Sequence, residues 1–453
     1  MRQSVRSSVL GFLAMSSRPE GLRSQLVRGG LGSVVLKLTY LAFSFGTSVL
    51  LARILGPSSF GVYAYAMALV GLLLVPAQVG TPLLLVKEVA RLESAGRFGE
   101  LRGLLRSGMQ AVILASSVVV IVIATIMAMG ASVILPVTLE EFPLLHTLAL
   151  VPILALISYW AAAMRGLRRV VLAQLPEQLV RPGLFFTFVG VLMWVEPTHF
   201  SASKALALSI AASMTAGLVA IAIFRIVLPA YARWTPPIYN RRRWTFEAWP
   251  LTLLAGVQVI NSQVDMLLLG ALADSESAGS YRVAVQGSLL VAFGLDIANM
   301  AIAPHLSRLY HAKEFGRLQR LTTMAARFTL SAALPVALVF ILFGRDILGL
   351  VFGDPYRVAY VPLAILCIAQ LINAGAGSVG TLLNMSGYAR ETVRAVSFAT
   401  AINFFLGLVL IPRIGAEGAA VATASSVVFW NIYLLRKVRF QLNIYGSFVG
   451  KMN

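Results

Sequence analysis

Residues 60–84 read FGVYAYAMALVGLLLVPAQVGTPLL, a run of 25 residues that contains no charged side chain. About 20 mostly apolar residues are enough for a helix to cross the hydrocarbon core of a membrane. A single apolar segment crosses lipid as a helix, because lipid offers no partner to unpaired backbone N–H and C=O groups. This stretch therefore predicts a transmembrane helix.

The composition of the whole chain supports this class. Of its 453 residues, 58% are hydrophobic and 12% are charged, and the mean hydropathy is +0.83. A soluble domain carries about 25% charged residues and cannot hide this much apolar surface from water. We therefore predict an all-α, polytopic membrane protein with about 12 transmembrane helices.

Other runs along the chain have the same length and apolar character. The predicted spans cover residues 30–51, 60–84, 109–129, 144–164, 179–195, 204–228, 249–269, 278–302, 328–343, 360–384, 395–411 and 418–435.

Lysine and arginine are concentrated in alternate loops. Of the 37 Lys and Arg residues, 30 lie in the N-terminal segment, in the loops after even-numbered spans and in the tail, and 6 lie in the other loops. Loops rich in positive charge stay in the cytoplasm. We therefore expect a protein of the bacterial inner membrane with both termini on the cytoplasmic side. The net charge of +19 is then explained by the positive charge of the cytoplasmic loops, and we expect no nucleic-acid partner.

The first half of the chain is repeated in the second. Residues 50–66 (LLARILGPSSFGVYAYA) and 268–284 (LLGALADSESAGSYRVA) share Gly, Tyr and Ala at an offset of 218. Residues 91–104 and 308–321 share the pattern RLxxAxxFGxLxxL at an offset of 217. Six spans separate the copies, so the halves have the same orientation. The repeat predicts two lobes related by an axis along the membrane normal.

The longest polar break near the middle, YARWTPPIYNRRRWTFEAWP at residues 231–250, marks the boundary between the lobes. Transporters built from such repeats bind substrate between the lobes, near the bilayer midplane. A short apolar patch at residues 9–15 is expected to stay on the cytoplasmic side. We predict a cytoplasmic extension at 1–29, six-helix lobes at 30–230 and 249–436, a cytoplasmic linker at 231–248 and a cytoplasmic tail at 437–453.

Several stretches resemble the polysaccharide-exporting flippases, the O-antigen and oligosaccharide-lipid branch of the superfamily that also contains the multidrug and toxin extrusion transporters. The similarity extends from about residue 26 to about residue 435, and the order and spacing of the stretches make it specific. They are LLARILGPSSFGVYAYAMALVGLLL (50–74), VKEVARL (86–92), VDMLLLGALADSESAGSYRVA (264–284), FGDPYRVA (352–359) and IPRIGAEGAAVATASS (411–426).

The resemblance implies a flippase that moves undecaprenyl-pyrophosphate-linked oligosaccharide units by alternating access, for O-antigen, lipopolysaccharide or exopolysaccharide biosynthesis. It implies lipid-linked oligosaccharide, membrane lipid, an H⁺ or Na⁺ coupling ion and a polysaccharide polymerase as partners. The sequence contains no G-x-x-x-x-G-K-[ST] phosphate loop. Its four histidines, at 146, 199, 305 and 311, lack metal-ligand spacing. We therefore expect no cofactor, no metal and no catalytic residues.

Three other functions remain open at this point. The same scaffold suits a multidrug antiporter, in which aromatic and acidic groups hold organic cations. A membrane polysaccharide polymerase or ligase is a second alternative, although the predicted outer loops are short. A scaffold protein of the same envelope pathway is a third.

Ionisable groups within spans are costly unless they are paired or wetted, so each one is a candidate site. Lys37 and Tyr40 lie on one helix face with Ser33, Ser44 and Ser48. We predict that this face lines a cavity and that Lys37 binds phosphate oxygens. The alternative is that Lys37 extends toward the cytoplasmic interface.

Span seven carries a second polar face with Gln258, Asn261 and Asp265. Asp265 is the candidate for binding a coupling H⁺ or Na⁺, or for pairing with a cation of the other lobe. The alternative is a structural contact between helices.

Spans eight and ten supply further cavity candidates, each of which could instead hold helices together. Glycines 375, 377 and 380 in span ten favour close packing over bending. The candidates are Asp296, Asn299, Gln370 and Asn373.

Arg53 and Arg282 lie near the predicted outer ends of their spans. A guanidinium group matches the geometry of phosphate, so both join Lys37 as pyrophosphate candidates. The alternative role is anchoring at the membrane interface.

Overall fold

The computed structural model describes residues 22–129, 143–195 and 200–450, and within these ranges the regular secondary structure is entirely helical. The all-α prediction is therefore confirmed. The apolar patch at 9–15 and His199 lie outside the described residues.

The described residues in the first half of the chain form a series of helices. They are α2 (Leu22–Gln78), α3 (Thr81–Ser94), α4 (Phe98–Ala128), α5 (Leu144–Gly166), α6 (Val170–Leu175), the π-helix η1 (Pro176–Val180), α7 (Arg181–Val195), α8 (Ala202–Val227) and α9 (Ala230–Trp234).

The second half begins within the segment predicted as the linker. Its helices are α10 (Arg241–Leu272), α11 (Ser275–His311), α12 (Phe315–Phe352), the 3₁₀-helix η2 (Asp354–Ala359), α13 (Tyr360–Ala376), α14 (Val379–Met385) and α15 (Ala389–Leu442).

Ten helical segments of the described chain are long and apolar enough to cross a membrane. Two of them, α2 and α15, are each two helices joined at a sharp bend. The bend in α2 is at Gly56, with φ 69° and ψ 173°, and the bend in α15 includes Gly415, with φ 52° and ψ −126°. Glycine adopts positive φ without steric cost. Each bent helix contains two of the predicted spans. The ten helical segments therefore correspond to all of the spans predicted from the sequence.

Three predicted spans differ in detail from the structure. The second predicted span, 60–84, runs past the end of α2 at Gln78 and into α3, which begins at Thr81. The helical segment of the fifth predicted span begins at Val170, nine residues before the predicted start at 179, and passes through η1. The tenth predicted span is interrupted, because Gly377 has φ 71° and separates α13 from α14. A Cβ on Gly377 would lie 2.6 Å from the Cβ of Ala326, so this glycine both breaks the helix and allows close packing.

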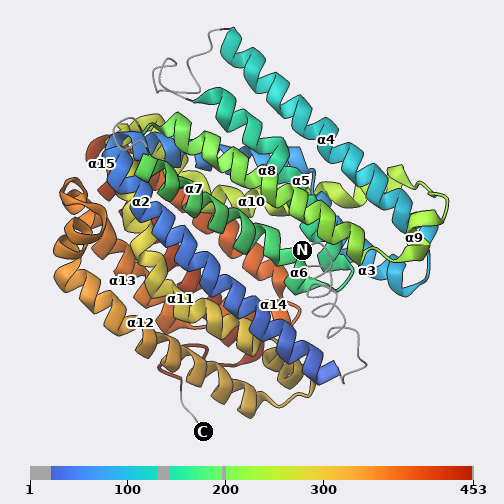
Figure 1. The fold of residues 1–453 in the computed structure, drawn as a ribbon. Helices are drawn as coiled ribbons and strands as arrows, with labels where there is room; N and C mark the ends of the chain where they lie inside the picture. The colour runs from blue at the N-terminus through green and yellow to red at the C-terminus, as the bar shows by residue number, and fades with distance from the viewer. Residues whose placement is uncertain (1–21, 130–142, 196–199, 451–453) are drawn as a thin grey trace.

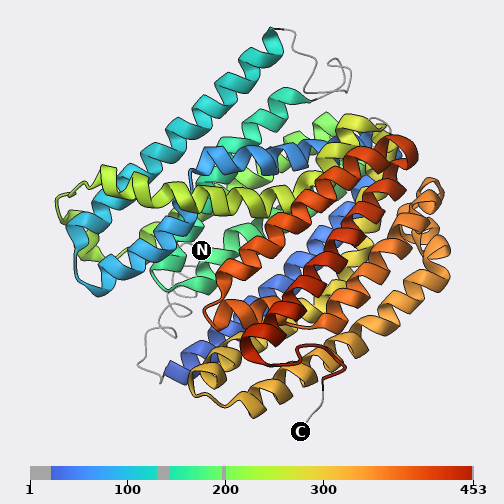
Figure 2. The same ribbon diagram turned by 180° about the vertical axis from the view of Figure 1, so that it is seen from behind.

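The helices form two lobes that meet along α2. In the first lobe α5 packs against α2, α3 and α8, and in the second α13 packs against α12 and α15. α2 crosses the boundary and packs against both α10 and α11. In Figures 1 and 2, α4, α5 and α8 lie on one side and α12 and α13 on the other, and the two groups converge where α2 and α15 bend.

At this convergence the backbones of the lobes touch, and we call the contact around Gly61, Ser275 and Gly279 the lobe seam. A Cβ on Gly61 would lie 1.7 Å from the carbonyl oxygen of Ser275, and one on Gly279 would lie 2.1 Å from that of Pro57. A buried apolar cluster surrounds the seam and includes residues from both lobes. The seam therefore closes one end of the boundary without room for a larger side chain.

The opposite end of α10 is tied to the first lobe by charged groups. Lys87 of α3 lies 3.2 Å from Glu247 of α10, and Arg243 lies 2.7 Å from Glu247. Glu88 is buried and accepts from Arg91 across 2.6 Å. Lys87–Glu247 and a further ion pair, Arg243–Glu88 at 3.8 Å, join α3 to α10 at the end of α10 opposite the lobe seam.

The chain segment after α15 packs back onto the second lobe. The N–H of Phe448 donates to the carbonyl of Gly375 across 3.1 Å, next to the break at Gly377. Arg327 of α12 donates to the carbonyl of Phe448 across 3.0 Å. The segment thus holds α12 against the interrupted helix.

Candidate functional site

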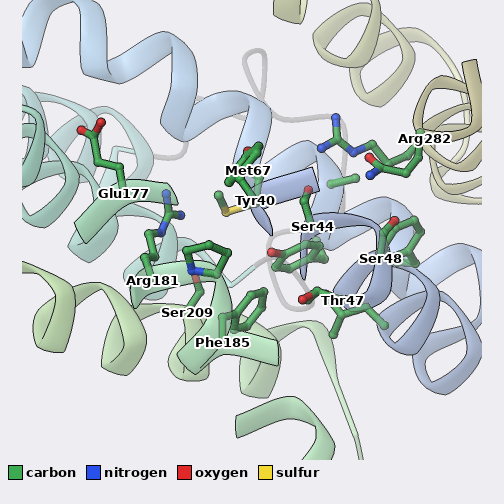
Figure 3. Close-up of a pocket in the computed structure, with 16 residues that line it drawn as sticks. Tyr40, Ser44, Thr47, Ser48, Met67, Glu177, Arg181, Phe185, Ser209 and Arg282 are labelled. Atoms are coloured by element: carbon green, nitrogen blue, oxygen red, sulfur yellow. The ribbon is translucent and has the colours of Figure 1, made fainter. Parts of the chain in front are cut away.

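A polar cavity of about 180 Å³ lies between the bent α2, the α6–η1–α7 segment, α8 and α11 (Figure 3). It takes residues from both lobes, because α11 belongs to the second. Its lining residues are Tyr40, Ser44, Thr47, Ser48, Leu51, Phe60, Tyr63, Ala64, Met67, Glu177, Arg181, Pro182, Phe185, Ser209, Arg282 and Gln286.

The polar stripe of α2 forms one wall of the cavity. Tyr40, Ser44 and Ser48 recur every four residues, so they share one helix face, as predicted. The hydroxyl groups of Thr47 and Ser48 are buried, and neither has a hydrogen-bond partner within the described residues. Buried polar groups are normally satisfied by protein or water. This wall is therefore suited to a polar occupant.

Two arginines supply positive charge from different lobes. Arg181 begins α7 in the first lobe, and Arg282 comes from α11 in the second. Figure 3 shows them on opposite sides of the cavity. Tyr63 lies within electrostatic range of both guanidinium groups and of Tyr40. Two guanidinium groups and phenol hydroxyls suit an anion rich in oxygen, such as a phosphate.

Arg181 and Glu177 are cavity residues that the sequence analysis missed. Arg181 lies inside the predicted span 179–195, but its charge was counted only with the positive loop after span four; in the structure it lies within a helical segment that starts at Val170. Glu177 lies in η1, within electrostatic range of Arg181 and Arg165. A π-helical turn shifts the register of the side chains that follow it, and such turns are frequent at functional sites. The spacing of four residues between Glu177 and Arg181 was the available signal.

The structure separates the pyrophosphate candidates. Arg282 lines the cavity. Lys37 lies one turn before Tyr40 on α2, and its ammonium donates to the carboxylate of Asp296 across 2.8 Å. Arg53 lies near the lobe seam, where it donates to the carbonyl of Val351 across 2.8 Å and also to that of Leu350. These carbonyls belong to the last turn of α12, where helices lack internal partners.

Asp265 is half-buried inside the second lobe. It accepts hydrogen bonds from the hydroxyls of Tyr281 and Thr423, each across 2.8 Å, and from the amide of Asn403. Among the described residues it forms no ion pair with Lys or Arg. Three converging donors and a carboxylate form a compact polar site composed of α10, α11 and α15.

The remaining candidates lie within the second lobe or at its surface. Asn261 accepts from Thr400 across 2.8 Å, and Asn299 accepts from Thr381 across 3.0 Å. Asn373 donates to Gln370 across 3.2 Å. Gln258 is exposed, and none of these residues lines the cavity. Tyr281 and Arg282 are neighbours, so α11 contributes to both the Asp265 site and the cavity.

This architecture of long apolar helices in two lobes around a polar cavity defines a multi-pass membrane transporter. A family described as Polysaccharide biosynthesis protein matches residues 26–310, and a second, MatE, matches residues 250–409. The first match covers more than half of the chain. The chain therefore belongs to the polysaccharide biosynthesis protein family, within the superfamily of flippases and multidrug exporters.

Two curated relatives from Haloferax volcanii are described as flippases. The "Probable low-salt glycan biosynthesis flippase Agl15" is 26% identical over 168 residues, which are 36% of this chain and 35% of the relative. The "Probable flippase AglR" is 27% identical over 178 residues, 39% of this chain and 37% of the relative. The matched segments thus span about a third of the length of these relatives.

Solved structures share the fold over nearly the whole chain. An inward-facing multidrug resistance MATE transporter aligns with a TM-score of 0.72 and 11% identity, covering 91% of this chain and 98% of its own. The lipid II flippase MurJ, in an inward closed conformation, aligns with a TM-score of 0.68 and 14% identity, covering 91% and 87%.

Proposed function

We propose that this protein is a flippase that moves lipid-linked oligosaccharide units, carried on undecaprenyl pyrophosphate, across the cytoplasmic membrane. The observation that carries the proposal is the cavity with Arg181 from one lobe and Arg282 from the other. Pyrophosphate and sugars cannot cross hydrocarbon unaided, so they need a polar, cationic and wetted path. The descriptions of the two Haloferax volcanii relatives as flippases, one of them in glycan biosynthesis, support a glycan flippase.

The lobe arrangement suggests how the cavity is exposed to one side at a time. The predicted orientation puts the lobe seam toward the outer face and both termini in the cytoplasm. The substrate then reaches the cavity from the cytoplasm and leaves after the seam opens. One pyrophosphate would bind guanidinium groups of both lobes. Substrate binding would thereby be coupled to movement of the lobes relative to each other.

Asp265 is our candidate for the coupling ion, either H⁺ or Na⁺. Its carboxylate and the oxygens of Thr423 and Tyr281 are hard ligands of the kind that an alkali cation accepts. A proton is the other occupant that a buried carboxylate takes readily. We place the protein in cell-surface polysaccharide biosynthesis, before a polymerase, and assign it no catalytic step.

The test is transbilayer movement of a fluorescent undecaprenyl-pyrophosphate monosaccharide in phosphatidylcholine vesicles, followed with a membrane-impermeant quencher. We expect the protein to accelerate movement. The double variant Arg181→Gln/Arg282→Gln should slow it at least about tenfold, because charge-assisted hydrogen bonds are lost. Arg357→Gln, which breaks an exposed 2.9 Å ion pair with Asp354, is the control. Movement no faster than in protein-free vesicles would contradict the proposal.

A multidrug antiporter is the second candidate, favoured by the MatE match and by Glu177 in the cavity. A carboxylate and the aromatic side chains of Tyr63 and Phe185 could hold an organic cation. The same vesicles, loaded with ethidium, separate the two functions. Ethidium movement that is abolished by Glu177→Gln, with no lipid movement, would favour the antiporter.

A further inference from the structure

Lys37 and Asp296 form an ion pair across the lobe boundary, away from the cavity. Lys37 is on α2 and Asp296 is on α11, and their charged groups lie 2.8 Å apart. The side chains are 35% and 54% exposed, so a molecule arriving from outside the protein can reach both. Ion pairs this exposed are weak, because solvent screens the charges.

The polar face of α2 connects the pair to the cavity. On α2, Lys37 is followed at helical spacing by Tyr40 and Ser44, which line the cavity. On α11, Asp296 lies 14 residues after Arg282, so at 3.6 residues per turn the two residues lie about 40° apart around the helix. At a rise of 1.5 Å per residue this separation is about 21 Å along the helix axis. The pair thus stands at one end of the polar face of α2, and the cavity that Arg282 lines lies further along it.

We propose, resting on the proposed function, that Lys37 is the first phosphate-binding position on the substrate path and that Asp296 occupies it until a lipid-linked phosphate displaces the carboxylate. The Lys37 ammonium is a compact point charge on a flexible chain, which suits transient capture of a phosphate. A pyrophosphate carries more charge than one carboxylate, so it competes effectively for the ammonium group.

Displacement has a second consequence at this position. Once phosphate is bound to Lys37, the released Asp296 carboxylate stands beside it as a like charge. Repulsion between them favours movement of the phosphate along the polar face of α2 toward the guanidinium groups of Arg181 and Arg282 in the cavity. Asp296 is therefore a positioning residue that delays binding at Lys37 and then promotes transfer to the cavity.

The experiment is equilibrium binding of undecaprenyl pyrophosphate to the full chain in phosphatidylcholine nanodiscs, with undecaprenol as the uncharged lipid. Asp296→Asn removes the competing carboxylate and should tighten pyrophosphate binding about two- to fivefold, the range that an exposed ion pair provides. Asp296→Glu keeps the carboxylate and should bind like the wild type. Lys37→Gln should weaken binding, and adding it to Asp296→Asn should cancel the gain.

The matched control is Asp354→Asn, which neutralises an aspartate of an exposed ion pair outside the cavity and should leave affinity unchanged. Equal or weaker binding by Asp296→Asn, or an equal gain with Asp354→Asn, would overturn the inference. Loss of the pyrophosphate preference over undecaprenol in the wild type would instead overturn the proposed function. The two failures are therefore distinguishable.

Discussion

Gly61 and Gly279 face each other across the lobe seam, and they are equivalent residues of the internal repeat, 218 positions apart. Their contacts are reciprocal: a Cβ on Gly61 would approach Ser275 at 1.7 Å, and one on Gly279 would approach Pro57 at 2.1 Å. Pro57 and Ser275 are also 218 positions apart. The seam therefore lies on the axis that relates the lobes.

Gly61→Ala or Gly279→Ala should prevent the seam from closing, because the added methyl group meets backbone atoms that cannot move aside independently. We expect transport of the lipid probe to fall strongly while folded protein is still obtained. Size-exclusion chromatography and the vesicle assay check this. Gly190→Ala is the matched control, since a Cβ there meets nothing within 4 Å. Normal transport by both seam variants would show that close backbone contact is unnecessary.

Arg53→Gln should loosen the seam without filling it. The guanidinium joins α2 to the last turn of α12, and its loss leaves the Val351 carbonyl without this donor. We expect greater labelling of a cysteine introduced at Ser44 by a thiol reagent applied from the outer side. Cys367, the single cysteine, is buried and is replaced by Ser in the background. If Arg53→Gln leaves the labelling of the introduced cysteine unchanged, Arg53 does not help to close the lobe seam.

Asp265→Asn should retain the fold and remove ion dependence. An amide oxygen still accepts from the Tyr281 and Thr423 hydroxyls, but it carries no charge and cannot take up a proton. We expect lipid movement in vesicles to stop responding to imposed H⁺ and Na⁺ gradients. If the variant follows a gradient as the wild type does, the coupling ion binds elsewhere.

Arg327→Ala should destabilise the second lobe by about 1 kcal/mol, because it removes hydrogen bonds to the segment after α15. We expect a lower midpoint of thermal unfolding in detergent, with wild-type affinity for the lipid probe. Arg317→Ala is the control, since its partner Glu314 is only three residues away and ties no segments together. Equal midpoints for both variants would show that the segment adds no stability.

The arrangement of spans could be predicted from the sequence because the length and polarity of a membrane helix are local properties. The cavity could be predicted only in part. Tyr40 and Arg282 were identified, but Arg181 was missed, because its charge was counted with the positive charge of the loop after span four. Here a polar cavity allows the charge to remain inside the helical segment.

Contacts between helices that are far apart in the chain could not be predicted from the sequence. The partners of Asp265 come from α11 and from both halves of α15, up to 158 residues away. Lys37 and Asp296 are 259 residues apart. Each was identified as a candidate because a polar group in lipid needs a partner. Which partner it finds depends on how the lobes pack, and no local pattern encodes that.

The neighbouring positions of Tyr281 and Arg282 connect two polar sites through α11. One side chain reaches the carboxylate of the second lobe, and the next faces the chamber shared with the first. A small rotation of this one helix would alter both environments together. Rotation of α11 about its own axis would then couple ion binding at Asp265 to substrate binding in the cavity. No chain of intermediate residues between the two sites would be needed.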